Sequence, residues 1–307
     1  MNIEKLDFEN LDFVNYELSS YIESFRKYII NSPSSISKET CRLHYLNLLG
    51  FDKYLYLKYK NIEFNVCDLN EEDIKDYRDF CMKILNNSRI TVNSKLLSIR
   101  LLIKYMVDIE KVYKYNFSLN VPKLKVEKTA PKHINPSHIK LIMDIIRKNT
   151  YGVRDICICK IIISTGLKMK SIFSLRMSNI DLKDKVIQLS IDGTNYKYPM
   201  NDSLFNDLKD YINLRSTLSP DTDYLFINDK GGPKNIRSFQ TTFKNAVITA
   251  NLPCDYTPQN LRASFMYVMG SKLSEERLQE VSNQKIVKQY CELKDNPLAD
   301  IKWLFCK

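Results

Sequence analysis

A basic stretch in the middle of the chain, which contains two prolines, restricts the possible folds more than any other feature of the sequence. Residues 121–133 read VPKLKVEKTAPKH, where four lysines are accompanied by a single glutamate. Proline fixes the backbone angle φ and lacks an amide hydrogen, so this stretch favours an extended conformation. Apolar residues with helical spacing precede it and follow it. The sequence therefore predicts two domains, residues 1–122 and 134–307, joined by a basic linker, residues 123–133.

The first predicted domain has the apolar periodicity of amphipathic helices. Leu48, Leu49 and Leu55 recur at helical spacing behind a serine-rich segment that can cap a helix. Asn70 precedes three acidic residues, and a polar cap followed by negative charge stabilises the first turn of a helix. The expected helices cover residues 16–30, 37–60, a segment that begins after Asn70, and 91–107. Short connections between them predict an all-helical bundle that ends near residue 120.

The second predicted domain is mainly α-helical with a small β-sheet. Asn135 and Pro136 form a cap and first-turn pair that opens a helix, as do Thr257 and Pro258. The segments VIQLSI and TNYKYPM flank an Asp-Gly pair, which predicts a β-hairpin over residues 186–200. Helices are also expected over residues 154–164, 168–176 and 296–307, and residues 224–228 either add a strand or end a helix.

The balance of charges favours a polyanionic partner. Lys and Arg total 46 whereas Asp and Glu total 36, which gives a formal net charge of +10. Such a charge attracts nucleic acid, and the linker lysines can lie along a phosphate backbone. A solvated tether between domains is the alternative interpretation of the same lysines. Charge and linker together favour double-stranded DNA as the partner.

Other features disfavour secreted, membrane and metal-binding proteins. The chain starts with MNIEKLDFENLDF, which is acidic where a secretory signal needs a basic and then an apolar run. No apolar segment reaches membrane-spanning length, so we expect a cytoplasmic protein. The eight cysteines form no CxxC pair, which predicts reduced core thiols and no metal site. Abundant Lys, Asn, Ile and Tyr indicate an AT-rich coding sequence, as in a low-GC bacterium or its mobile DNA.

Four segments and one tyrosine, taken together, resemble one known family. Residues 154–182 read RDICICKIIISTGLKMKSIFSLRMSNIDL, and DYLFINDKGGPKN (223–235), TPQNLRASF (257–265) and Tyr290 follow in order. Upstream, TVNSKLLSIRLLIKYM (91–106) resembles the last long helix of a core-binding domain. The chain is similar over residues 15–292 to the tyrosine recombinase, or phage integrase, family. The resemblance implies a helical, SAM-like core-binding domain and a mixed α/β catalytic-type domain that close around a duplex.

The resemblance also implies a reaction. In that family two arginines, a lysine, two histidine-type residues and a tyrosine act on DNA. The tyrosine oxygen attacks the scissile phosphate and the guanidinium groups stabilise the developing charge, while the lysine protonates the leaving 5′-oxygen. This chemistry requires no metal and no nucleotide cofactor.

Carried over position by position, the family pattern is filled only in part. Arg262 matches the second arginine and Tyr290 matches the nucleophile. Lys168 stands in the TGLR arginine position, where a lysine keeps the charge and loses the planar, bidentate fork. Gln259 stands where the family has a histidine. For the lysine the hairpin offers Lys197, although the spacing to the following proline favours a position near residue 194.

A further histidine or tryptophan position cannot be filled, because no such residue lies between Arg262 and Tyr290. Each lost donor to an oxyanion typically reduces the rate by about 10²–10³. The resemblance therefore implies a recombinase fold with a degenerate active site. The alternative is a working integrase in which the residues present act together and Tyr290 forms a 3′-phosphotyrosyl link.

Three functions follow as hypotheses. The first is a DNA-binding protein with little or no recombinase activity, which acts in replication initiation or maintenance of a plasmid or mobile element. The second is the working integrase, and the third is a helical interaction protein without DNA. The tail either docks on a neighbouring subunit as a homo-oligomer contact or closes its own core. The expected DNA-binding residues are Lys95, Arg100, Lys123, Lys125, Lys128, Lys132 and Arg237.

Overall fold

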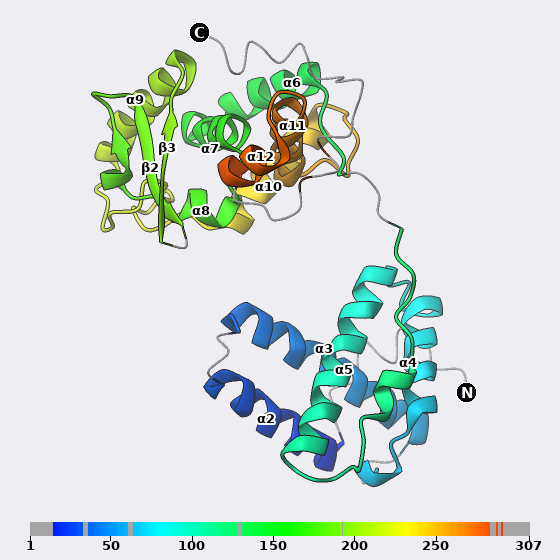
Figure 1. Ribbon diagram of the computed structural model, residues 1–307. Helices are drawn as coiled ribbons and strands as arrows, with labels where there is room; N and C mark the ends of the chain where they lie inside the picture. Colours follow the sequence, from blue (N-terminus) through cyan, green and yellow to red (C-terminus); the bar gives the residue numbers. More distant parts are fainter. Residues whose placement is uncertain are drawn as a thin grey trace. The chain divides into compact units, whose positions relative to one another are not determined.

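The chain forms two compact units, Met1–Lys128 and Thr129–Lys307 (Figure 1). The structure is a computed structural model that describes residues 15–32, 36–60, 64–127, 131–191, 193–282, 287 and 290. Lys128 and the expected tail helix, residues 296–307, lie outside the described residues. No helix in the described ranges is long and apolar enough to cross a membrane.

The first unit is the helical bundle that the periodicity predicts. The four α-helices in the described part of this unit each begin after a side chain that accepts a hydrogen bond from the first turn, namely Asn15, Ser37, Asn70 and Ser88. The helices are α2 (Tyr16–Asn31), α3 (Lys38–Tyr59), α4 (Glu71–Lys83) and α5 (Arg89–Asp108), with short 3₁₀ turns η1 (Val66–Asp68) and η2 (Phe117–Asn120). The apolar faces of α2, α3, α4 and α5 meet in one core. The bundle ends at Asn120, as expected.

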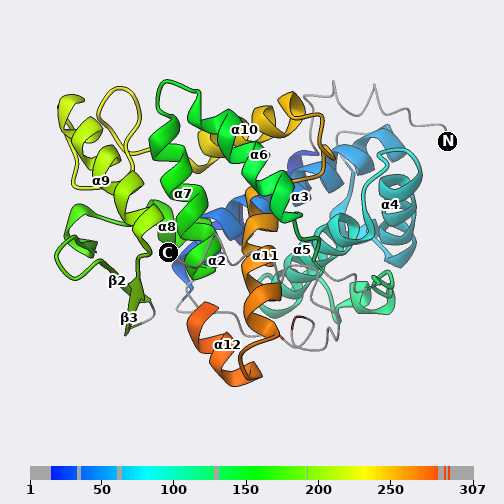
Figure 2. The same ribbon diagram turned by 90° about the horizontal axis from the view of Figure 1, so that it is seen from above.

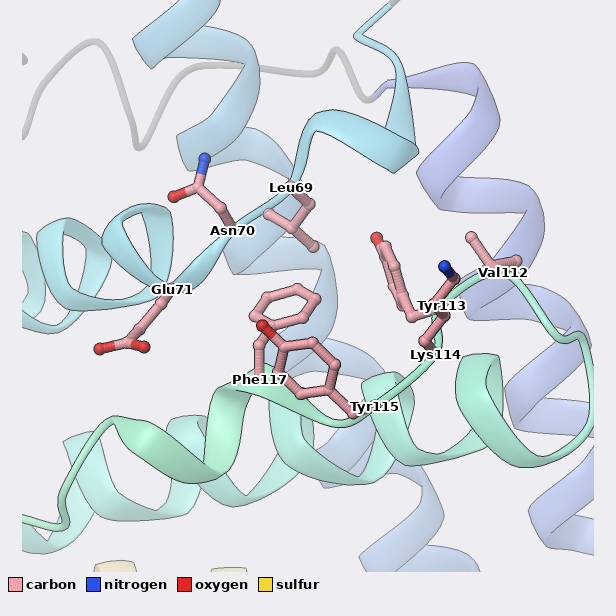
Figure 3. A pocket seen from close by; sticks show the side chains of 8 residues that line it. All are labelled: Leu69, Asn70, Glu71, Val112, Tyr113, Lys114, Tyr115 and Phe117. Atoms are coloured by element: carbon pink, nitrogen blue, oxygen red, sulfur yellow. The ribbon is translucent and has the colours of Figure 1, made fainter.

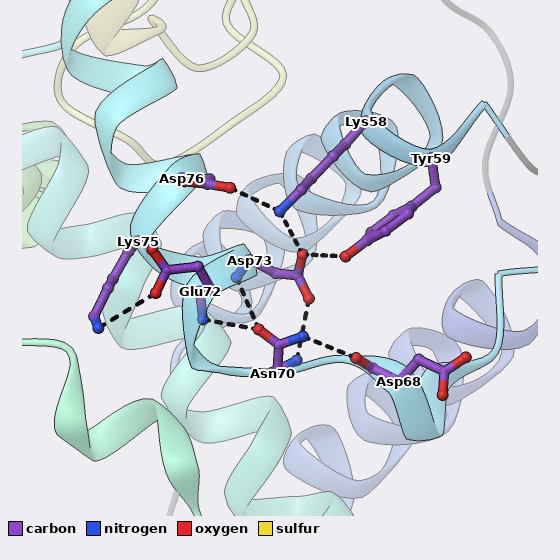
Figure 4. Close-up of polar contacts among 8 residues, drawn as sticks. All are labelled: Lys58, Tyr59, Asp68, Asn70, Glu72, Asp73, Lys75 and Asp76. Carbon is purple, nitrogen blue, oxygen red and sulfur yellow. Dashed lines mark hydrogen bonds and ion pairs between the residues drawn. The ribbon is translucent and has the colours of Figure 1, made fainter. Parts of the chain in front are cut away.

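The start of α4 is joined to the end of α3 by a polar network around Asp73 (Figure 4). The Asp73 carboxylate, fully buried, accepts from the Lys58 ammonium at 2.7 Å, from the Tyr59 hydroxyl and from the Asn70 amide at 3.1 Å. The Asn70 side chain accepts in turn from the Glu72 amide at 2.9 Å. One carboxylate thus completes the capping box of α4 and fixes the angle between α3 and α4.

A buried carboxylate joins α2 to α3. Both oxygens of Asp52, whose side chain is inaccessible to solvent, accept from the Asn15 amide at 3.1 Å. Burial raises the pKa of Asp52 to about 7, and the hydrogen bond from Asn15 opposes this shift only in part. The folded protein therefore holds this proton more tightly than the unfolded chain does.

The stability of the first unit is expected to fall as the pH rises from about 4 to 7. Over this window the folded state keeps the Asp52 proton that the unfolded state has already lost, so the free energy of unfolding falls by up to about 1.4 kcal/mol per pH unit. Urea unfolding at several pH values should show this slope in the wild type and a smaller one in Asp52→Asn, which cannot titrate. Equal slopes in both proteins would contradict the assignment.

The second unit is built around α7 (Gly152–Thr165), whose isoleucines and cysteines are buried on nearly all sides. Figures 1 and 2 show α7 between the neighbouring helices, and it packs against α6, α9 and α11. The other helices are α6 (Pro136–Arg147), α8 (Met169–Phe173), α9 (Asp202–Thr217), α10 (Ile236–Thr249), α11 (Pro258–Gly270) and α12 (Glu275–Ser282), with one 3₁₀ turn, η3 (Met177–Asn179). Asn135 caps α6 and Pro136 opens it, as predicted.

Among the residues that the structure describes, the sheet has three antiparallel strands in the order β1-β2-β3. The predicted hairpin is present as β2 (Val186–Ile191) and β3 (Thr194–Pro199), with Leu189 opposite Tyr196. The two-residue strand β1 (Ile180–Asp181) was not predicted, because two residues carry no readable alternation. The fold is thus mainly α-helical with a small sheet, as the sequence indicated.

Two predictions of local structure were wrong in detail. The helix expected over residues 168–176 ends at Phe173, because the backbone beyond it pairs with the segment around Tyr224: the Leu225 amide donates to the Leu175 carbonyl at 2.7 Å. Residues 224–228 accordingly form isolated bridges and not a strand or a helix end. Cys67 and Cys254 are exposed, so the expectation that all the thiols are buried was also wrong.

Candidate functional site

The TGLK turn between α7 and α8 lies against α11. Gly166 ends α7 with a positive φ of 64°, and a Cβ at this position would lie 2.3 Å from the Phe265 ring. Only glycine fits both the conformation and the close approach. The Gly166 carbonyl accepts from Nε of the buried Arg262 at 2.6 Å. Lys168, two residues further on, is thereby held in the same part of the unit as Arg262.

The C-terminal end of α12 accepts hydrogen bonds from Arg262 and from Tyr198 of the hairpin. One Arg262 NH2 group donates to the Ser282 carbonyl at 3.0 Å, and the Tyr198 hydroxyl of β3 donates to the preceding carbonyl, that of Val281, at 3.2 Å. The end of α12 is therefore the place where α11 and the sheet are joined. Arg262 thus donates from Nε and from one NH2 group to backbone carbonyls, and its NH1 group takes no part in these two hydrogen bonds.

Tyr290 packs on α11 close to Arg262. Its side chain is 5% exposed, and its ring meets that of Tyr267 edge-on, with centroids 5.1 Å apart and planes at 79°. Burial lowers the pKa of Arg262, and Tyr290 acts on that guanidinium in the opposite direction. Of the residues that match the family pattern, Arg262 lies on α11 and Tyr290 packs against the same helix through Tyr267 and Gly270.

The remaining predicted catalytic residues are exposed. Lys168 occupies the N-cap position of α8, and Gln259 lies in the first turn of α11, three residues before Arg262. Lys197 pairs with Gln188 across the hairpin. Because side chains alternate along a strand, Lys197 faces away from the side on which Tyr198 binds α12. A catalytic role for each of the three stays a prediction.

The first half of the linker is held on α5. The Asn93 side chain donates to the Leu124 carbonyl at 2.9 Å and accepts from the Leu124 amide at 2.8 Å, and Arg89 donates to the Lys125 carbonyl at 3.1 Å. Lys123 and Lys125 have exposed side chains. These hydrogen bonds hold the backbone of the linker in place, and the ammonium groups of Lys123 and Lys125 face solvent.

The second half of the linker is held on α11. The Lys132 ammonium pairs with Asp255 at 2.7 Å and lies 5.0 Å from the centre of the Tyr256 ring, while the Lys132 carbonyl accepts from Asn260 at 2.7 Å. This exposed ion pair is weak, since solvent and salt screen it. Lys132 can therefore exchange Asp255 for another anion.

The other predicted DNA contacts differ in their surroundings. The Lys95 ammonium lies 3.7 Å from the Cys81 sulfur and 5.7 Å from the centre of the Tyr77 ring, within the bundle. Arg100 donates to the carbonyls of Ser118 and Val121 and so ties α5 to the start of the linker. Arg237 is exposed in the first turn of α10. DNA contact by these three residues stays a prediction.

The sequence reasoning missed a buried cluster of charges at the start of α7. Arg154 donates to both oxygens of Asp155, at 3.0 and 3.3 Å, and to the Ile227 carbonyl at 2.9 Å. The Lys234 ammonium lies 3.4 Å from the same carboxylate, and all three side chains are at most 8% exposed. Burial lowers the pKa of Lys234. The Arg-Asp pair was readable as a motif, whereas nothing in the sequence indicated that Lys234 would be buried beside it.

Among the recesses on the described parts of the chain, two have a volume of about 390 Å³ each. One is in the first unit, where Tyr113, Tyr115 and Phe117 line a recess beside Leu69 and Asn70 (Figure 3). The other lies in the second unit and is lined by Lys170, Phe173, Ser174, Tyr224, Pro233, Lys234, Asn235 and Ile236. Lys234 thus joins the buried cluster to a basic recess at the start of α10.

Comparisons with solved structures agree with this architecture. The structure of XerH site-specific recombinase bound to a difH substrate matches with a TM-score of 0.71 at 17% identity, over 92% of this chain and 95% of that one. A lambda integrase dimer bound to a COC′ core site matches with a TM-score of 0.68 at 12% identity, over 89% and 76%. At such low identity these matches show the fold alone.

Comparisons of sequence identify the family. Tyrosine recombinase XerC of Haemophilus ducreyi is 24% identical over 176 residues, which cover 57% of this chain and 58% of that relative. XerC of Myxococcus xanthus is 24% identical over 275 residues, 86% of this chain and 89% of the relative. The profile of the phage integrase family matches residues 132–296, which is more than half of the chain. The chain therefore belongs to the phage integrase family and has the tyrosine recombinase fold.

Proposed function

We propose that this protein binds double-stranded DNA through its basic linker and carries out little or no strand exchange. The observation that carries the proposal is the linker itself, whose two ends are hydrogen-bonded to α5 and α11 while Lys123 and Lys125 face solvent. Exposed ammonium groups on a held backbone can contact the phosphates of a duplex. The solved relatives in which XerH and lambda integrase are bound to DNA support the same partner.

We propose low strand-exchange activity because the residues at the catalytic positions offer fewer hydrogen-bond and proton donors to a phosphate than the family pattern does. Lys168 offers a point charge where a fork would grip two phosphate oxygens, and Gln259 cannot transfer a proton as histidine does. Arg262 spends Nε and one NH2 hydrogen on the carbonyls of Gly166 and Ser282. A DNA-binding role in replication initiation or maintenance of a plasmid or mobile element is therefore our preferred function.

A specific observation favours the second candidate, a working recombinase. Tyr290 packs through Tyr267 and Gly270 on α11, the helix that also carries Arg262, as a nucleophile and a phosphate-binding guanidinium of one site would. In this candidate Tyr290 forms a 3′-phosphotyrosyl link to DNA. A complex with nicked duplex that survives denaturing detergent separates it from the preferred function.

DNA affinity is expected to fall steeply with salt, because each neutralised phosphate contributes about 0.9 to the slope of log K against log salt. Lys123→Gln with Lys125→Gln should reduce that slope by about 2, since two phosphate contacts are lost. Filter binding of duplex fragments from the encoding element, between low and moderate salt, measures both quantities.

The matched control is Lys27→Gln with Lys104→Gln, which removes the same charge from exposed positions on α2 and α5. An equal loss in both double variants would show that net charge, and not the linker, sets the affinity. Failure of the wild type to retain any duplex at moderate salt would overturn the proposal as a whole.

A further inference from the structure

The end of the linker runs along one face of α11. Asn260 and Ser264 bind the linker on either side of His133, since Asn260 donates to the Lys132 carbonyl at 2.7 Å and Ser264 accepts from the Ile134 amide at 3.0 Å. His133 itself meets the next residue of that face, Tyr267, with ring centres 4.9 Å apart and planes at 68°. Positions 260, 264 and 267 lie on one side of the helix because they are four and three residues apart.

Tyr267 continues the contact to Tyr290. The three rings of His133, Tyr267 and Tyr290, here called the aromatic row, meet in two successive edge-on pairs at 4.9 and 5.1 Å. Both distances lie in the range of roughly 4.5–7 Å that such pairs favour. Burial lowers the pKa of His133, so its ring is neutral at neutral pH and needs no counter-ion within the row.

Gly270 supports the same placement from the next turn of α11. A Cβ at Gly270 would lie 2.4 Å from the Tyr290 carbonyl oxygen and 3.1 Å from the Tyr290 Cβ. Gly270 follows Tyr267 by three residues, so the two positions form one surface on which Tyr290 rests. The backbone of Tyr290 can approach this surface only because position 270 has no side chain.

We propose that His133 and Tyr267 are positioning residues that hold the Tyr290 ring against α11, the helix that carries Arg262, and that the linker thereby controls where this tyrosine lies. His133 is one residue from Lys132, a predicted DNA contact, so a linker drawn onto DNA would pull on the first ring of the row. The inference goes beyond DNA binding and holds whether or not Tyr290 cleaves DNA.

The experiment measures the accessibility of Tyr290 by nitration of the full-length protein with tetranitromethane and peptide mass mapping. The readout is the ratio of nitration at Tyr290 to that at Tyr211, a tyrosine of the same unit that is 1% exposed and bonded to the Leu225 carbonyl. General loosening of the unit would raise both, whereas loss of positioning raises Tyr290 alone.

Tyr267→Ala and His133→Ala are expected to raise the ratio by about two- to tenfold, the change that corresponds to the loss of one edge-to-face pair. Tyr267→Phe and His133→Phe keep a ring and should stay at the wild-type ratio, while Gly270→Ala should raise it by displacing the Tyr290 backbone. Duplex affinity, measured on the same variants, reports separately on the proposed function. An unchanged ratio in both alanine variants, or an equal rise at Tyr211, would overturn the inference.

Discussion

Asp155→Asn is expected to lower the free energy of unfolding of the second unit by about 3–5 kcal/mol, because it leaves two buried cations without their shared anion. The Asp155 carboxylate accepts from Arg154 through both oxygens and lies 3.4 Å from the Lys234 ammonium. All three groups are almost fully buried, so solvent screens them little. Asparagine has the same size and isolates the loss of charge from any change in packing.

Urea unfolding followed by circular dichroism measures this effect, and hydrogen exchange of the α7 amides assigns it to the second unit. Asp144→Asn serves as the matched control, because Asp144 is exposed on α6 and its replacement should change the stability by at most about 0.5 kcal/mol. A loss for Asp155→Asn no larger than that of the control would contradict a stabilising role for the cluster.

Lys168→Arg is expected to raise the yield of a covalent Tyr290–DNA complex by about ten- to a hundredfold over the wild type. A planar guanidinium restores the two parallel hydrogen bonds to phosphate oxygens that an ammonium cannot make, and one oxyanion donor is worth about 10²–10³ in rate. Lys168 is exposed at the start of α8, so the longer side chain fits without displacing its neighbours.

The assay uses nicked duplex, denaturing detergent and a second preparation that carries Tyr290→Phe in addition. The complex should be absent from the Tyr290→Phe protein whichever residue stands at position 168. If Lys168→Arg forms no more complex than the wild type, the missing fork is not what limits the site. In that case the unfilled histidine positions, or the use of the Arg262 donors by carbonyls, are the stronger limits.

The sequence determined the fold class and most element boundaries, because these depend on local chemistry. The Asn70 and Asn135 side chains cap their helices by accepting hydrogen bonds from backbone amides only two or three residues away. The hairpin at residues 186–200 follows from alternating side chains around a turn. The order of the motifs was also enough to indicate the family to which the chain belongs.

Tertiary packing decided the rest, since contacts between distant residues leave no periodic mark on a sequence. Whether Lys168 to Arg176 continued as one helix depended on the segment around Tyr224, which takes the backbone out of the helix after Phe173. In the sequence, Lys234 cannot be distinguished from the other basic residues. The fold buries it beside Asp155, which lies 79 residues earlier in the chain.

For the candidate site, too, the sequence indicated the residue types, whereas tertiary packing decided their burial and contacts. The identities of Arg262, Tyr290 and Lys168 were available from motif spacing, since the family pattern is a pattern of residue types. That Arg262 is buried against two carbonyls, and that His133 reaches Tyr290 through Tyr267, depended on how α11 packs between the linker and α12. Spacing records which groups a chain can offer, whereas burial and approach are properties of the whole packed unit and arise only when distant segments meet.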